Sequence, residues 1–224
     1  MRLASLVSLL SAAIAAPVAQ ASPSGVVISQ VYGANGNAFD SDYVELHNSG
    51  STAVSLSGWS IQYASATGTG NFSGNGAVAL TGTLQPGQFY LVKLATAAAG
   101  TALPVTADAT GTLNLSSSAG KVILARTTSG LACNGGSTPC TAAQLAQIED
   151  LVGYGTANFF EGAAAASAPG MTLALFRAAA GCTDTNNNSL DFAVGSPAPR
   201  NSTSTFVICG GGGGGGNAPI VPTC

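Results

Sequence analysis

Short apolar runs, separated by turn signals every 8 to 12 residues, dominate the chain from Val26 onward. The run Tyr43-Val-Glu-Leu-His47 alternates, with Val44 and Leu46 on one face of a strand and its other three residues on the opposite face. Regularly spaced short strands are typical of a sandwich or a barrel, so the sequence predicts an all-β fold. Further strands are expected at 26–32, 58–63, 88–94, 113–115, 121–126, 151–154 and 171–177.

One segment carries a helical pattern instead. Thr141 is a suitable N-cap, and Leu145, Ile148 and Leu151 are spaced to share one helix face. The sequence therefore predicts one short helix over 141–150 within the β-domain.

The first 21 residues have the pattern of a secretory signal peptide. Arg2 precedes an apolar stretch at 3–16, and Ala19-Gln20-Ala21 offers the small residues that a signal peptidase requires. The apolar stretch is too short to span a membrane. We therefore expect residues 1–21 to direct export, with cleavage after Ala21, and a single β-domain to occupy residues 22–209.

A glycine-rich segment follows this domain. Residues 210–216 are all glycine, and such a run behaves as a flexible tether with an r.m.s. span of roughly 15 Å. We expect residues 210–224 to be a linker that leads to a further, downstream domain.

The exterior of the domain is expected to be nearly neutral. Only 7% of the residues are charged, yet 46% are hydrophobic, which favours a folded domain over a disordered chain. The six Lys and Arg residues are scattered singly among nine Asp and Glu residues. Nucleic-acid binding relies on clustered basic residues, so tight direct binding of nucleic acid is not expected. The expected partner is a downstream domain of the same protein or another extracellular or surface protein.

Four of the five cysteines form two candidate disulfides. Cys133 and Cys140 enclose a short turn-rich loop, and Cys182 and Cys209 flank the last predicted strands. A zinc site is the poorer interpretation, because paired CxxC motifs and accompanying histidines are missing. An exported chain also favours disulfides. Cys224 is then left over, and we expect its partner in a further part of the protein.

His47 is the only histidine, and it lies two residues from Glu45 on the same strand face. An acid–base pair is one interpretation, and hydrogen bonding within the sandwich or contact with solvent is the other. Neither a second histidine nor a recognisable nucleophile accompanies the pair. We therefore expect no catalytic and no cofactor-binding residues, and predict that this segment is not an enzyme.

The segment 184–191 is the candidate for a metal ion. Asp184, Asn186, Asn188 and Asp191 supply oxygen atoms at the spacing that a loop around Ca²⁺ requires. The segment lacks the glycine and the bidentate glutamate of an EF-hand loop, and Asx-turns explain asparagine-rich loops without any metal. We predict no cofactor and no metal ligands, with calcium at this loop as the alternative.

Trp59, the single tryptophan, lies in the strand expected at 58–63. A lone tryptophan in an alternating strand is usually a core residue, and stacking against a carbohydrate is the alternative.

Four segments resemble the lamin tail domain family and follow one another in that family's order. They are Tyr43-Val-Glu-Leu-His-Asn48, Leu56-Ser-Gly-Trp-Ser-Ile61, Leu84-Gln-Pro-Gly-Gln88 and the hairpin into Lys121-Val-Ile-Leu124. The resemblance covers residues 24–207. It implies an immunoglobulin-like β-sandwich with Trp59 in its core.

The later part of the chain resembles a bacterial secreted subgroup of this family. The segments that carry this resemblance are the Cys133–Cys140 loop, Asn158-Phe-Phe-Glu-Gly162, 181–188 and 198–202. Domains of the subgroup often stand in front of extracellular nucleases of the endonuclease/exonuclease/phosphatase fold. The resemblance implies a secreted, non-catalytic binding or spacer domain, an accessory module of a larger extracellular protein. Two alternatives stay open: the N-terminal part of a secreted metal-dependent endonuclease, and a stand-alone adhesion or glycan-binding domain.

Overall fold

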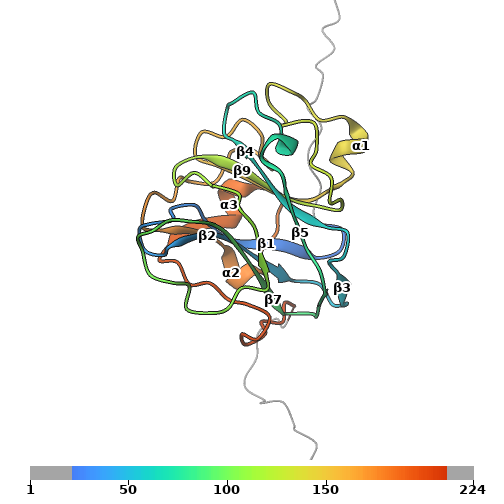
Figure 1. Ribbon diagram of the computed structural model, residues 1–224. Helices are drawn as coiled ribbons and strands as arrows, with labels where there is room; N and C mark the ends of the chain where they lie inside the picture. Colours follow the sequence, from blue (N-terminus) through green and yellow to red (C-terminus); the bar gives the residue numbers. More distant parts are fainter. Residues whose placement is uncertain (1–21, 211–224) are drawn as a thin grey trace, which may run out of the picture.

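Two β-sheets pack face to face in the computed structural model, which describes residues 22–210 (Figure 1). The larger sheet has the strand order β12 (Phe192–Gly195), β11 (Ala174–Arg177), β1 (Val26–Tyr32), β2 (Ser41–Asn48), β7 (Phe89–Thr96) and β8 (Ala109–Thr110). The smaller sheet has the order β10 (Ile148–Tyr154), β9 (Gly120–Ala125), β4 (Ser60–Ser65) and β5 (Ala77–Ala79), and β3 (Val54–Ser55) pairs with β6 (Thr83–Leu84). All pairings of these strands are antiparallel except the β7–β8 pairing. The prediction of an all-β, immunoglobulin-like sandwich is confirmed.

The main core lies between the two sheets and follows the alternation of the sequence. Val44 and Leu46 of β2 point into it, as do Val122 and Leu124 of β9 and Val152 of β10. These side chains are fully buried, and each contributes about 1.5–3 kcal/mol through removal of apolar surface from water. The two-residue period of β2 therefore places its apolar residues as predicted.

The outer faces of both sheets are also covered, so several strands are buried on both sides. Ile123 of β9 and Leu151 of β10 pack under the loop that contains Cys133. Tyr32 and Tyr43 stack on the outer face of the larger sheet, with ring centroids 5.4 Å apart. Few charged side chains are therefore needed to solvate the sheets.

The predicted helix at 141–150 is wrong beyond its first turn. The structure has α1 at Ala142–Leu145, where Thr141 and Gln144 form a capping box. Residues 148–154 form β10 instead, because pairing with β9 supplies their backbone hydrogen bonds and sends Leu151 and Val152 to opposite faces. Three other one-turn helices were not predicted: η1 (Phe72–Asn75), α2 (Ala178–Gly181) and α3 (Asn188–Asp191).

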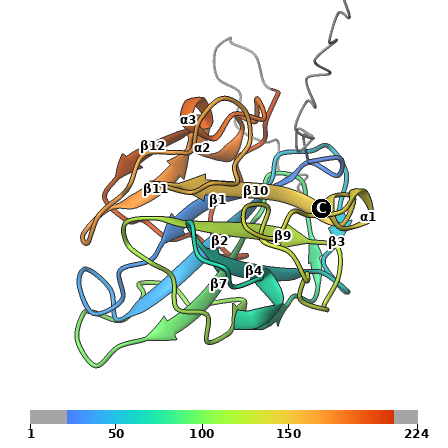
Figure 2. The ribbon, with the colours of Figure 1, turned by 90° about the horizontal axis from the view of Figure 1, so that it is seen from above.

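The two sheets are joined at a seam where β10 lies beside β1 (Figure 2). Both strands carry a register shift here, at Ser29 in β1 and at Glu149 in β10. The shift turns the backbone of Ile28 toward the other sheet, and its N–H donates to Asp150 Oδ2 at 2.5 Å. Arg177 of β11 completes the seam: its Nε donates to the carbonyl oxygen of Ile28 at 2.9 Å, and its Nη2 contacts both Asp150 oxygens at 2.9 and 2.7 Å.

We predict that Arg177→Ala lowers the free energy of unfolding by about 3–5 kcal/mol, because it leaves Asp150 buried without its partner. Urea denaturation followed by tryptophan fluorescence measures the change. Lys93→Ala is the control: this side chain is half-buried, makes none of the salt bridges among the described residues, and should change stability by less than about 0.5 kcal/mol. Equal losses of stability in the two variants would contradict the stabilising role of Arg177 in the seam.

Candidate functional site

A C-terminal strap, defined as residues 196–209, crosses the outer face of the larger sheet. Its first part exchanges two hydrogen bonds with Gln30 of β1, through the backbone N–H and C=O of Ala198. Its middle contacts β2 through Arg200 and reaches Asp108 through Ser202. Its end is held by the Cys182–Cys209 disulfide. The strap covers the strand face on which the sequence places Glu45 and His47.

Glu45 and His47 are both fully buried beneath this strap. The Glu45 carboxylate accepts from Ser29 Oγ at 2.6 Å and from the backbone N–H and Nη2 of Arg200 at 2.6 and 2.7 Å. The His47 ring stacks on Phe89 with centroids 4.5 Å apart. Burial lowers the pKa of His47, which favours its neutral form.

Glu45 and His47 make their hydrogen bonds with other groups of the protein. Each Glu45 oxygen accepts from Ser29, Gln30 or Arg200, and each ring nitrogen of His47 faces a backbone carbonyl oxygen. A general base needs a substrate proton within hydrogen-bond reach. The arrangement therefore ties the strap to the sheet.

The Asp184–Asp191 segment is organised around Arg177. The guanidinium Nη1 lies 3.2 Å from Asp184 Oδ1 and 3.6 Å from Asp191 Oδ2. Asp191 also accepts from the N–H and Oγ1 of Thr185 at 2.9 and 2.6 Å. Asn186 Oδ1 is buried without a hydrogen-bond partner among the described residues. Arg177 thus supplies the positive charge that the loop carboxylates face.

Asn188, a candidate calcium ligand, instead covers the free edge of β10. Its Oδ1 accepts from the N–H of Gly153 at 2.8 Å, and its Nδ2 donates to the Leu151 carbonyl at 2.9 Å and to Glu161 at 3.2 Å. Burial, and then the nearby charge of Asp150, raise the pKa of Glu161 to about 9. At neutral pH this buried carboxyl is therefore protonated.

A cavity of about 640 Å³ opens beside the start of the strap. Its walls are almost entirely apolar, with Arg177 and Arg200 as the polar exceptions. Ala179 and Ala180 of α2 line it with positive φ angles of 51° and 58°. The left-handed conformation is unfavourable for alanine by roughly 1–2 kcal/mol per residue, and such strain gathers at functional sites. The remaining lining residues are Pro104, Phe176, Ala178, Ala193, Ala198 and Pro199.

Lys121 is a buried charged residue whose burial the sequence analysis did not predict. Its Nζ donates to the carbonyl of Asn134 at 2.8 Å and to Asn158 Oδ1 at 2.9 Å. Burial lowers the pKa of this amine to about 8. The lysine ties the Cys133–Cys140 loop, closed by its disulfide, to the outer face of β9.

Trp59 lies just before β4 and is partly buried against the main core. The guanidinium of Arg126 sits 5.5 Å from its ring centroid, and Arg126 also pairs with Glu149. The tryptophan, expected in the core, is therefore only partly buried, at the margin of the main core.

The fold and the strap define an immunoglobulin-like β-sandwich domain stapled by two disulfides. The model of the lamin tail domain family matches residues 19–133. The chain belongs to the lamin tail domain family.

One solved structure supports the fold over a larger part of the chain. It is a DUF4876 family protein from Bacteroides thetaiotaomicron, with 12% sequence identity and a TM-score of 0.50, and the match covers 82% of this chain and 74% of that one. At this identity the likeness concerns the fold alone. None of the curated proteins matches the chain significantly. Within residues 22–210, no helix has the length and apolarity needed to cross a membrane.

We predict that Glu161→Gln stabilises the domain at pH 8 by on the order of 1 kcal/mol or more, with a much smaller effect at pH 5. The folded-state pKa of Glu161 is raised above its unfolded value, so the folded state holds the proton more tightly and loses stability as the pH rises between those values. Glutamine mimics the protonated acid and removes this loss, while the charges that face it, Asp150, Arg177, Asp184 and Asp191, are unchanged. Urea titrations of both proteins at the two pH values measure the change in the free energy of unfolding. A gain of equal size at both would contradict the prediction.

Proposed function

We propose that the chain is a secreted, non-catalytic binding or spacer module that serves as an accessory domain of a larger extracellular protein. The observation that carries the proposal is the use of its charged groups. More than half of the charged side chains among residues 22–210 are buried, and those at Glu45 and Arg177 tie structural elements together. Membership of the lamin tail domain family and two disulfides support this interpretation.

The remaining parts of the proposal come from sequence patterns. Residues 1–21, the glycine run after Gly210 and Cys224 lie outside the described residues. Export through a signal peptide cleaved after Ala21, and a linker at 210–224 that leads to a further domain, therefore stay predictions. The signal pattern is tested by N-terminal sequencing of the secreted protein, and the linker by reading the gene beyond codon 224.

The second candidate is the N-terminal part of a secreted metal-dependent nuclease, with the active site in a downstream domain. It rests on the resemblance of the later segments to the bacterial secreted subgroup. In both cases the present chain supplies binding or spacing, and the partner is a neighbouring domain or an extracellular protein.

We predict that the purified chain does not hydrolyse plasmid DNA in the presence of Mg²⁺ or Ca²⁺. Its single histidine is buried between Gly181 and Val207, so no imidazole can activate water at a scissile phosphate. Agarose gels of supercoiled plasmid measure the reaction, with a metal-dependent nuclease as positive control. Robust cleavage that disappears in His47→Ala would overturn the non-catalytic assignment.

We also propose that the domain needs no metal cofactor for folding. The Asp191 carboxylate accepts protein N–H and O–H groups, and Asp184 Oδ1 faces Arg177, so protein donors already occupy positions that Ca²⁺ would need. Calcium at about 1 mM, the range for extracellular modules, should leave the melting temperature of the chelated protein unchanged. A rise of several degrees would instead indicate a calcium site, with Asn186 Oδ1 as its available oxygen.

A further inference from the structure

The His47 ring lies between two backbone carbonyl groups. Its Nδ1 is 3.2 Å from the oxygen of Gly181, and its Nε2 is 2.9 Å from the oxygen of Val207. A neutral imidazole carries a single N–H and can donate to only one of them. Because the ring is fully buried, one ring nitrogen is left with a lone pair that faces no donor.

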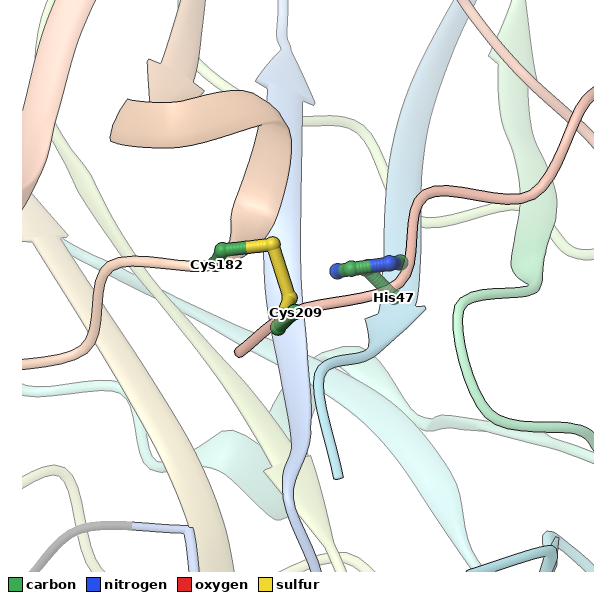
Figure 3. Close-up of side chains that lie close together, drawn as sticks. All are labelled: His47, Cys182 and Cys209. Atoms are coloured by element: carbon green, nitrogen blue, oxygen red, sulfur yellow. A yellow bond between two sulfur atoms is a disulfide. The ribbon is translucent and has the colours of Figure 1, made fainter. Parts of the chain in front are cut away.

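Two sulfur atoms lie beside this ring. Gly181 precedes Cys182, Cys209 follows Val207 by two residues, and the two cysteines form the disulfide that fastens the end of the strap. One nitrogen of His47 and the two sulfurs all lie within 4.8 Å of one another. Figure 3 shows the ring edge directed at the disulfide.

The backbone at Gly181 makes this approach possible. Gly181 has a φ of 103°, and a Cβ at this position would lie 2.8 Å from His47 Nδ1. Any side chain here would push the ring away from the sulfurs. Because glycine lacks a side chain, the imidazole of β2 can lie next to the two cysteines, which come from the end of α2 and from the strap.

We propose that reduction of the Cys182–Cys209 disulfide converts this cluster into a binding site for Zn²⁺, with His47, Cys182 and Cys209 as its ligands. Thiolate sulfur and imidazole nitrogen are the donors that zinc prefers, at about 2.3 and 2.0–2.1 Å. Tetrahedral ligands at these distances lie roughly 3.5 Å apart. The ligand atoms need to move by only about 1–2 Å from their present arrangement, and a water molecule fills the fourth position.

The chemical steps balance with a phosphine as reductant. The phosphine takes the oxygen of a water molecule to become the phosphine oxide, the S–S bond breaks, and the two hydrogens of that water end on the two sulfur atoms. Zinc then displaces both thiol protons as two Zn–S bonds form, and the free lone pair of His47 forms the Zn–N bond. The closed disulfide offers no thiolate, so zinc binding depends on the redox state.

The chain contains its own control, because the second disulfide, Cys133–Cys140, has no histidine beside it. Two variants of the full chain separate the pairs. In the first, Cys133, Cys140 and Cys224 are replaced by serine, which leaves the His47 pair. In the second, Cys182, Cys209 and Cys224 are replaced, which leaves the other pair.

Zinc binding is measured by competition with a chromophoric chelator, before and after phosphine treatment without oxygen, and Co²⁺ gives an independent signal through its thiolate charge-transfer band. The first variant should bind one equivalent of zinc when reduced and none when oxidised. The second variant should bind with at least about tenfold lower affinity, and His47→Gln in the first should cause a similar loss.

Folding is followed by circular dichroism in the same samples. If reduction loosens the first variant, zinc should raise its melting temperature and His47→Gln should abolish the rise. The proposal is overturned if the reduced first variant binds no zinc, if His47→Gln leaves its affinity unchanged, or if zinc fails to stabilise the reduced fold. In those cases His47 serves only to hold the strap against the sheet.

Discussion

The contact of Arg177 with Asp150 and Ile28 is the interaction on which the rest of the structure depends. It brings together β11, β1 and β10, and so connects the larger sheet to the smaller one. The register shifts in β1 and β10 face each other at this point, since Ile28 both donates to Asp150 and accepts from Arg177. A guanidinium suits this position because its fixed fork of donors satisfies a carboxylate and a carbonyl at once.

The same residue also organises the next segment of the chain. Asp184 and Asp191 face the guanidinium from the other side, which fixes the turn that leads through α3 into β12. From there the strap returns across the larger sheet, and Arg200 pairs with Glu45 much as Arg177 pairs with Asp150. Buried ion pairs are costly to desolvate and add little net stability, but a missing partner is strongly destabilising. They therefore specify which segments lie together. Within residues 22–210, more than half of the charged side chains are buried in such internal contacts.

Much of the fold can be predicted from the sequence because strand patterns depend on residues that are close together along the chain. The alternation in β2 and the apolar runs of β1, β7 and β9 predict strands, and the order of short motifs predicts the family. The helix expected at 141–150 failed because Leu145, Ile148 and Leu151 share one face only if the helix continues. Pairing of 148–154 with β9 overrides that local pattern. Because residues 148–150 were expected in a helix, the role of Asp150 in the seam was not predicted.

The contacts of His47 and Arg177 are harder to predict because they join residues that are far apart in the sequence. His47 meets Gly181 and Val207 across 134 and 160 residues, and Arg177 reaches Ile28 across 149. The one available signal was composition: in a chain with only 7% charged residues, a single arginine at the end of an apolar strand is a candidate for a buried partner of an acid. The cavity beside α2 gave no such signal, since alanines in a left-handed conformation cannot be recognised from sequence.

Native-state hydrogen exchange on Arg177→Gln tests most directly whether the seam unites the two sheets. Protection is compared with the unaltered chain for amides of β1, in the larger sheet, and of β10, in the smaller one. If the seam holds the sheets as one cooperative unit, amides in both strands lose protection together and by similar free energies. Loss of protection confined to the larger sheet, with β10 unchanged, would contradict the central role of Arg177.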